Sequence, residues 1–189
     1  MDKSSLRVLY KQKRNDLTDE AIASLDLALL AQLKSWDWSA YNYVHCFLSI
    51  EKFKEFNTKA FISWIWKVYP NLKIVVSKSD FATQEMEHFI YDQETHLEVN
   101  SWGIPEPVNG LKINPNEIDA VITPLLVTDI HGNRIGYGKG FYDRFFTLCR
   151  EDLVKIGLSY FEPVTAIDDV SAWDIPIDVL LTPHQIYTF

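Results

Sequence analysis

Short apolar runs alternate along the chain with longer stretches whose apolar residues recur at helical spacing. Runs of this length predict buried strands, and they fall at 43–50, 72–78, 119–127, 154–160 and, as the last strand, 178–182. The stretches with helical spacing predict helices at 3–14, after a cap at Thr18, at 58–69 and at 140–149. Strands that alternate with helices indicate an α/β layered domain with a largely parallel central sheet flanked by helices.

Two stretches between the predicted strands are less regular. Residues 86–91, MEHFIY, predict a further strand, whereas SWGIPEPVNG at 101–110 is interrupted by glycine and proline and predicts an irregular surface loop. The sequence contains no linker, internal repeat or low-complexity tract, and 189 residues suit one domain with one sizeable core. We therefore expect residues 1–189 to form a single domain.

The composition narrows the classes of partner. A hydrophobic content of 47% and an aromatic content of 14% are typical of a folded globule rather than a disordered chain. The net charge of −8, without a dense run of Lys and Arg, argues against nucleic acid and anionic membranes as partners. The N-terminus lacks the apolar core of a signal peptide, and the apolar runs stay well short of a membrane span. We expect a cytoplasmic monomer that binds small molecules.

The two cysteines, Cys46 and Cys149, lie far apart in the sequence and have no companion Cys or His at a metal-ligand spacing. Such an arrangement indicates neither a zinc site nor a disulfide framework. We expect both thiols to be reduced and buried.

The segment TDIHGNRIGYGKGFYDR at 128–144 lies between a predicted strand and a predicted helix. Its alternating glycines at 136, 138 and 140 favour neither a helix nor a strand. Backbone N–H groups can approach an anion closely where no Cβ intervenes, and Arg134 and Lys139 add positive charge. The segment therefore predicts a polyphosphate site, although it matches neither the Walker A nor the dinucleotide pattern. The alternative is a Gly-rich hairpin or tight turn.

Charged residues near this segment and at the N-terminus leave two further choices open. Lys3, Arg7, Lys11 and Arg14 share one face of the first predicted helix, which is either a solvated stripe or an anion-binding face. Asp143 stands just inside the helix after the glycines, where it either holds a magnesium ion on phosphates or favours the positive end of the helix.

The stretch RIGYGKGFYDR at 134–144 resembles the signature segment of the 5-formyltetrahydrofolate cyclo-ligase family. Other stretches resemble that family in the same order: KSSLR at 3–7, EFNT at 55–58, GIPEP at 103–107, IGLSY at 156–160 and WDIPIDVLLTP at 173–183. The resemblance spans nearly the whole chain. It implies an α/β enzyme, a ligase that converts 5-formyltetrahydrofolate and ATP into 5,10-methenyltetrahydrofolate, ADP and phosphate with the help of Mg²⁺.

The resemblance also implies roles for individual residues. Residues that would contact ATP are Lys3, Ser4, Ser5, Leu6, Arg7, Arg134, Ile135, Gly136, Tyr137, Gly138, Lys139, Gly140, Phe141 and Tyr142. Residues that would contact the folate are Ile50, Glu55, Tyr137, Gly138, Lys139, Gly140 and Phe141. Catalysis would involve Arg134, Lys139 and Tyr142, and the magnesium ligands would be Asp143 and Asp174.

Several of these assignments keep a structural alternative. Glu55 stands just before a helix that Asn57 or Thr58 can cap, so it could belong to the helix start. Asp174 could serve a turn, and Tyr142 could be a buried structural tyrosine.

The chain also departs from the family pattern in two places. Additional residues precede Glu55, which makes Ile50 a less secure contact, and Pro163 stands where the family often has glutamine. Two other functions stay open at this point. One is a nucleotide- or RNA-binding protein of the same fold without catalysis, and the other is an enzyme like a sugar-phosphate isomerase or CoA-transferase, which needs no ATP.

Overall fold

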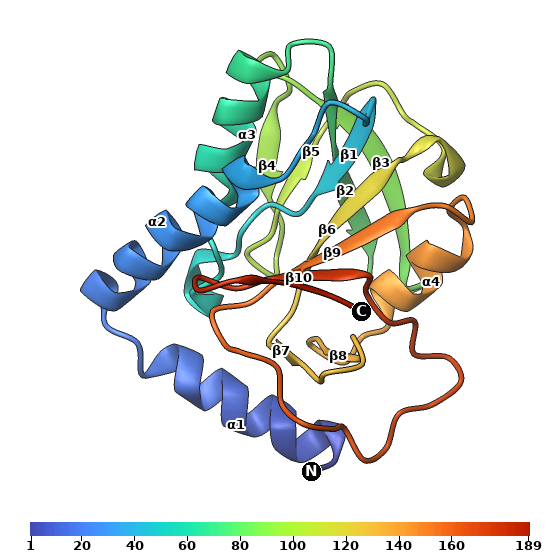
Figure 1. The fold of residues 1–189 in the computed structure, drawn as a ribbon. Helices are drawn as coiled ribbons and strands as arrows, with labels where there is room; N and C mark the ends of the chain where they lie inside the picture. Colours follow the sequence, from blue (N-terminus) through green and yellow to red (C-terminus); the bar gives the residue numbers. More distant parts are fainter.

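The computed structural model describes all 189 residues and shows a seven-stranded sheet with helices packed on both faces (Figure 1). The strands lie in the order β11-β10-β9-β6-β1-β2-β3. Neighbours from β10 to β2 are parallel, whereas the edge strands β11 and β3 are antiparallel to their neighbours. The strands are β1 (Tyr43–Cys46), β2 (Lys73–Asp80), β3 (Glu85–Tyr91), β6 (Ala120–Pro124), β9 (Val154–Leu158), β10 (Val179–Leu181) and β11 (Ile186–Thr188). The predicted α/β class with a largely parallel sheet is confirmed.

Four α-helices surround this sheet. They are α1 (Lys3–Asn15), α2 (Asp19–Ser35), α3 (Thr58–Val68) and α4 (Phe141–Thr147), and short 3₁₀ turns occupy Glu51–Phe53 and Pro115–Glu117. The Thr18 side chain accepts a hydrogen bond from the Ala21 N–H, and the Asn57 side chain accepts one from the Lys59 N–H. Both predicted helix starts are therefore confirmed, because each polar side chain satisfies an N–H group that the helix itself leaves unpaired. None of these helices combines the length and the apolar composition that crossing a membrane requires.

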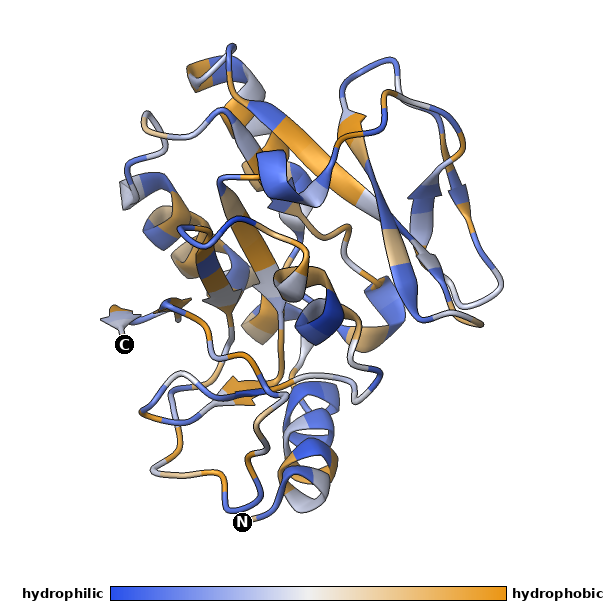
Figure 2. Cartoon of the chain, turned by 90° about the vertical axis from the view of Figure 1, so that its right-hand side faces the viewer, coloured by the Kyte–Doolittle hydropathy of each residue, from blue (hydrophilic) through white to orange (hydrophobic).

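Alternate residues of the central strands face two separate cores. Val44 and Cys46 of β1 belong to the larger core, which α2 and α3 cover, whereas Val75 of β2 faces the smaller core beneath α4. The strands are therefore largely apolar along their length, and hydrophobic colouring marks several strands inside the molecule in Figure 2. Cys46 is buried as predicted, and Cys149 is only half-buried; both are free thiols.

Helix α1 does not cover a face of the sheet. It lies across the edge where the parallel strands end, beside the small hairpin of β7 (Val127–Thr128) and β8 (Arg134–Ile135) (Figure 1). Leu6 and Tyr10 of α1 pack there against Leu126, Val127 and Ile135. This packing brings the N-terminal helix next to the segment that follows β8.

Several predicted boundaries are wrong. The strand predicted at 43–50 ends at Cys46, and the one predicted at 119–127 ends at Pro124, after which the Leu126 N–H donates to the Ile135 carbonyl oxygen in the β7–β8 hairpin. The helix predicted at 140–149 covers only Phe141–Thr147. An apolar run indicates that residues are buried, but it does not indicate which strand they pair with. It can therefore continue through residues that are buried outside the sheet.

Several short strands were not predicted. The loop at 101–110 contains β5 (Pro105–Pro107), which pairs with β4 (Leu97–Val99). The hydrogen bonds from Asn100 to Ile104 and from Val108 to His96 mark the even-numbered residues as the paired positions, so both prolines occupy positions whose nitrogen faces away from β4. The chain also adds β11 after the predicted last strand.

Candidate functional site

A cavity of about 560 Å³ opens where β1 and β6 end. This volume lies in the range of sites that hold small molecules. The wall combines segments that are far apart in the sequence: the start of α1, the residues after β1, the segment from β8 into α4, and Asp174. The C-terminal edge of a parallel sheet is where ligands of α/β proteins usually bind.

The glycine loop, Gly136–Gly140, connects β8 to α4 and forms one wall of the cavity. Gly138 has a φ of 83°, a left-handed conformation that glycine adopts without strain, and a Cβ added there would lie 3.1 Å from Cζ of Arg7. None of the five backbone N–H groups from Gly136 to Gly140 donates a hydrogen bond within the protein. The loop therefore presents unpaired donors to a ligand, as an anion site requires. The alternative of a hairpin applies only to the preceding β7–β8 segment.

The basic face of α1 borders the same cavity. Lys3, Arg7 and Lys11 all line it, so this face is not a simple solvated stripe. Arg7 Nε donates to the Gly136 carbonyl oxygen at 3.0 Å, and Lys11 Nζ lies 5.6 Å from the ring centroid of Tyr137. The helix and the glycine loop thus hold each other in place.

Asp143 and Asp174 lie on the same side of the cavity, and each is paired with a cation. Asp143 Oδ1 accepts hydrogen bonds from Arg134 Nη2 at 2.7 Å and from the Ile175 N–H at 3.2 Å. Asp174 Oδ2 accepts one from Lys3 Nζ at 2.7 Å. Because Ile175 follows Asp174 directly, its N–H bond to Asp143 joins the segment that carries Asp174 to the start of α4.

The second oxygen of each carboxylate accepts no hydrogen bond within the protein, so both remain available to a ligand. Burial acts to raise the pKa of Asp174, but the hydrogen bonds from Lys3 and the Ser171 N–H outweigh it and the pKa is lowered. Two carboxylates with free oxygens suit Mg²⁺, which typically takes one or two carboxylates and completes its shell with phosphate oxygens and water. The structure contains no group of three or more possible His, Cys, Asp or Glu ligands, so the protein alone does not form a complete metal cage.

Glu55 is turned into the cavity, although it precedes α3. Its Oε2 accepts a hydrogen bond from the Ile50 N–H at 2.7 Å, and its Oε1 accepts one from the Tyr137 hydroxyl at 2.6 Å. Burial raises the pKa of Glu55, while these two hydrogen bonds and the charge of Arg14 act in the opposite direction. Since Asn57 caps α3, Glu55 is not needed for the helix start.

Aromatic side chains form the rest of the wall near Glu55. Phe53 stacks on Tyr137 with ring centroids 5.1 Å apart, and Phe81 stacks on Trp102 at 4.9 Å. Phe53, Phe81 and Trp102 were missed in the sequence, because isolated aromatic residues in loops carry no periodic signal. They give the cavity flat apolar surfaces.

The remaining residues named in the sequence divide into three groups. Ile50, Lys139, Phe141 and Tyr142 line the cavity, and the Tyr142 hydroxyl makes no hydrogen bond within the protein. The side chains of Leu6 and Ile135 are buried in the core beneath α1, so any ligand contact from them would have to come from the backbone. Residues that lie outside the cavity wall are Ser4, Ser5 and Pro163.

Comparison with known proteins finds similarity over most of the chain. The model of the 5-formyltetrahydrofolate cyclo-ligase family matches residues 1–183. The 5-formyltetrahydrofolate cyclo-ligase of Haemophilus influenzae is 33% identical over 131 residues, which cover 67% of this chain and 70% of that protein. The probable 5-formyltetrahydrofolate cyclo-ligase of Schizosaccharomyces pombe is 26% identical over 203 residues, covering 98% and 97%. The NMR structure of Aquifex aeolicus 5,10-methenyltetrahydrofolate synthetase has a TM-score of 0.80 at 27% identity, covering 100% of this chain and 93% of that one.

Proposed function

The chain belongs to the 5-formyltetrahydrofolate cyclo-ligase family, and we propose that it uses ATP and Mg²⁺ to convert 5-formyltetrahydrofolate into 5,10-methenyltetrahydrofolate, ADP and phosphate. The observation that carries the proposal is that one cavity joins an anion-binding wall to an aromatic compartment with a buried carboxylate. These are the two surfaces that a triphosphate and a pterin need. Membership of this ligase family also sets aside the isomerase and CoA-transferase alternatives.

The anion-binding wall supports ATP as the co-substrate. Six cationic side chains line the cavity against three carboxylates, although the chain as a whole has a net charge of −8. The N–H groups of the glycine loop add unpaired donors beside Lys3, Arg7 and Lys139. A triphosphate would gain both charge compensation and directed hydrogen bonds there.

The aromatic compartment supports a reduced folate as the second substrate. Phe53, Phe81 and Trp102 offer flat apolar surface to a ring system. Glu55 would accept hydrogen bonds from the amino group and ring N–H of the pterin, and a partly apolar surrounding strengthens such charge-assisted bonds. The folate would then lie with its N5 formyl group toward the glycine loop.

The reaction would proceed in two steps. The formyl oxygen attacks the γ-phosphorus of ATP, and ADP leaves with the electron pair of the broken P–O bond. N10 then bonds to the formyl carbon and loses its proton to solvent, and phosphate leaves with the former formyl oxygen. Phosphoryl transfer depends on positioning and charge compensation, which Arg134, Lys139 and Arg7 would provide. Tyr142 would contact the reacting groups through its unpaired hydroxyl.

Asp143 and Asp174 are the residues that would hold Mg²⁺, since their free carboxylate oxygens fit a hard cation. The ion would supply positive charge to the phosphate oxygens. Lys3 and Arg134 would keep the two carboxylates oriented toward the glycine loop.

The direct test is to follow methenyltetrahydrofolate formation by its absorbance, with 5-formyltetrahydrofolate as substrate. We expect product only when ATP and Mg²⁺ are both present, and we expect one ADP for each product molecule. Product formation at the same rate without ATP would contradict the proposal. Folded protein that binds ATP but forms no product would favour the alternative of a nucleotide-binding protein without catalysis.

A further inference from the structure

Arg14, at the C-terminal end of α1, is a buried cation without a carboxylate partner. The residue is 4% exposed, its Nη2 donates to the Leu125 carbonyl oxygen, and its Nε makes no hydrogen bond. The remaining donor, Nη1, is 3.0 Å from the Tyr137 hydroxyl oxygen. A buried charge destabilises the folded protein unless nearby groups compensate for it. The contact between Arg14 and Tyr137 is therefore expected to have a role beyond packing.

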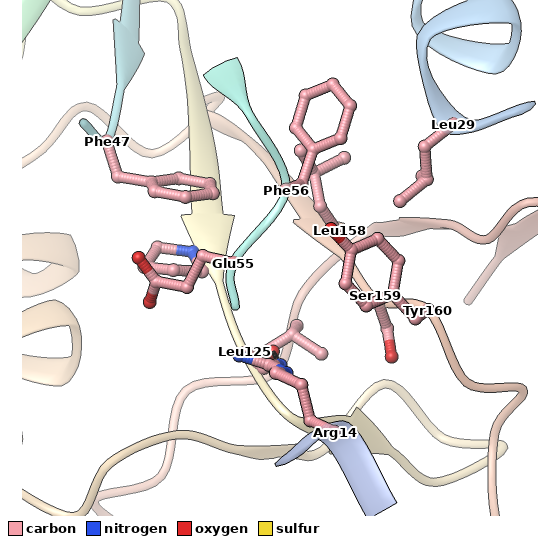
Figure 3. Close-up of a pocket in the computed structure, with 10 residues that line it drawn as sticks. Arg14, Leu29, Phe47, Glu55, Phe56, Leu125, Leu158, Ser159 and Tyr160 are labelled. Atoms are coloured by element: carbon pink, nitrogen blue, oxygen red, sulfur yellow. Dashed lines mark hydrogen bonds between the residues drawn. The ribbon is translucent and has the colours of Figure 1, made fainter. Parts of the chain in front are cut away.

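Tyr137 connects Arg14 to Glu55. A guanidinium group has donors only and cannot accept a hydrogen bond, so the single proton of the Tyr137 hydroxyl cannot point toward Arg14. The hydroxyl therefore accepts from Arg14 and donates its proton to Glu55 Oε1 at 2.6 Å. Arg14 and Glu55 also reach the same small second cavity from different elements (Figure 3).

Helix α1 fixes Tyr137 at more than one point. Arg7, Lys11 and Arg14 are spaced by four and three residues, so they follow one face of the helix. Arg7 contacts the Gly136 carbonyl oxygen, Lys11 lies over the ring of Tyr137, and Arg14 binds its hydroxyl. The tyrosine thus has little freedom to turn its hydroxyl elsewhere.

We propose that Arg14 is a positioning residue for Glu55: it directs the Tyr137 hydroxyl proton to Glu55, so that this carboxylate faces the pterin in one orientation and in its charged form. The inference rests on the proposed function, in which Glu55 binds the folate.

The charges around Glu55 agree with this role. Burial raises the pKa of Glu55, and the groups that act against burial are the Tyr137 hydroxyl, the Ile50 N–H and the Arg14 charge. Two further titratable groups face Glu55, namely Tyr142 of α4 and Tyr160 after β9, and the pKa of each is itself raised, so both are neutral near pH 7. If the hydroxyl proton no longer points to Glu55, burial is less opposed and the pKa of Glu55 rises further.

The test compares a donor-only side chain with one that can also accept. Arg14→Lys still only donates, whereas the amide oxygen of Arg14→Gln can accept the Tyr137 proton and draw it away from Glu55. Tyr137→Phe removes the proton altogether, and Lys13→Gln is the matched control because Lys13 is an exposed cation in the same helical turn. The measurement is kcat/KM for 5-formyltetrahydrofolate from about pH 5 to about pH 9 on the full-length variants.

We expect Arg14→Gln and Tyr137→Phe to move the acid limb of kcat/KM to higher pH. Both should also raise the folate KM by about tenfold, because one charge-assisted hydrogen bond is lost. The KM for ATP and kcat should change much less. Arg14→Lys and Lys13→Gln should keep the wild-type acid limb. The double variant Arg14→Gln, Tyr137→Phe should be no worse than Tyr137→Phe alone, because Arg14 acts through the tyrosine.

Three results would overturn the inference: an unmoved acid limb in Arg14→Gln, additive losses in the double variant, or an equal shift in Lys13→Gln. Should Arg14→Gln fail to fold, the pH profile of Arg14→Lys tests the inference. Lysine also only donates, so an acid limb of kcat/KM that shifts as far in Arg14→Lys as in Tyr137→Phe would contradict the proposed role of Arg14. A wild-type protein that forms no methenyltetrahydrofolate refutes the proposed function instead, so the two failures are distinct.

Discussion

Replacing Asp143 with asparagine separates its two possible roles, which are to pair with Arg134 and to hold Mg²⁺. The asparagine keeps an oxygen that can accept from Arg134 and from the Ile175 N–H, but it removes the negative charge. A charge-assisted hydrogen bond contributes about 1.5–3 kcal/mol and a neutral one about 1 kcal/mol, so the free energy of unfolding should fall by about 0.5–2 kcal/mol. For a chain of 189 residues this corresponds to a decrease in melting temperature of about 1–8 °C without ligand.

The effect of Asp143→Asn on turnover should be larger. If Asp143 is a magnesium ligand, losing its charge should remove about 3 kcal/mol of transition-state stabilisation, or roughly a hundredfold in kcat. Part of this loss should be recovered at high Mg²⁺, as a titration of the initial rate would show. Asp152→Asn is the matched control, because it also removes a carboxylate paired with an arginine, but at an exposed position outside the cavity.

A different result would refute this reasoning. Activity within about twofold of wild type at ordinary Mg²⁺, together with the lower melting temperature, would show that Asp143 only compensates the buried charge of Arg134.

Three further predictions concern other parts of the molecule. Glu55→Gln should raise the folate KM by at least about tenfold with little change in the ATP KM, because the pterin loses a charged acceptor; unchanged folate kinetics would place Glu55 outside the site. Gly138→Ala should weaken ATP binding and lower the melting temperature, since its φ is 83° and the Cβ meets Arg7, whereas a Cβ at Gly136 meets nothing within 4 Å and should leave the ligand-free melting temperature unchanged. Burial lowers the pKa of His88 to about 4, so the unfolded chain binds a proton that the native chain does not between about pH 6.5 and pH 4. The contribution of His88 to the free energy of unfolding should therefore fall by about 2 kcal/mol from pH 7 to pH 5, and urea unfolding of His88→Phe should show a weaker pH dependence.

The central sheet could be predicted from the sequence because each parallel strand is buried on both faces and therefore appears as a continuous apolar run. The small strand pairs could not. Pro105 and Pro107 make the sequence of β5 look like a loop, because proline cannot donate a backbone hydrogen bond. The strand still pairs because the nitrogen of each proline faces away from β4. The apolar run that contains Leu126 stays buried after it has left the sheet, so its pattern hides the β7–β8 hairpin.

The candidate site could be predicted only in part from the sequence. Helical spacing placed Arg14 on the basic face of α1, but it could not show that the end of this helix is covered by the segment around Leu125. Family resemblance named Asp143 and Asp174 as a pair of magnesium ligands, but the Ile175 N–H bond to Asp143 that links their two segments is a tertiary contact without a signal in the sequence. The unpaired N–H groups of the glycine loop likewise follow from backbone conformation, which residue types restrict but do not determine.

The ion pairs of the site bear on how ATP and Mg²⁺ would bind together. Lys3, proposed to contact phosphate, is held by Asp174, proposed to hold the metal, and Arg134 and Asp143 form a second pair of the same kind. A triphosphate alone would have to draw Lys3 away from Asp174 and leave that carboxylate uncompensated, and Mg²⁺ alone would leave the cation uncompensated. When both bind, Lys3 would exchange Asp174 for a phosphate and Asp174 would exchange Lys3 for Mg²⁺, so neither side chain is left with an unpaired charge. The two ligands would therefore favour each other's binding by the same factor, because coupling between two binding equilibria is reciprocal.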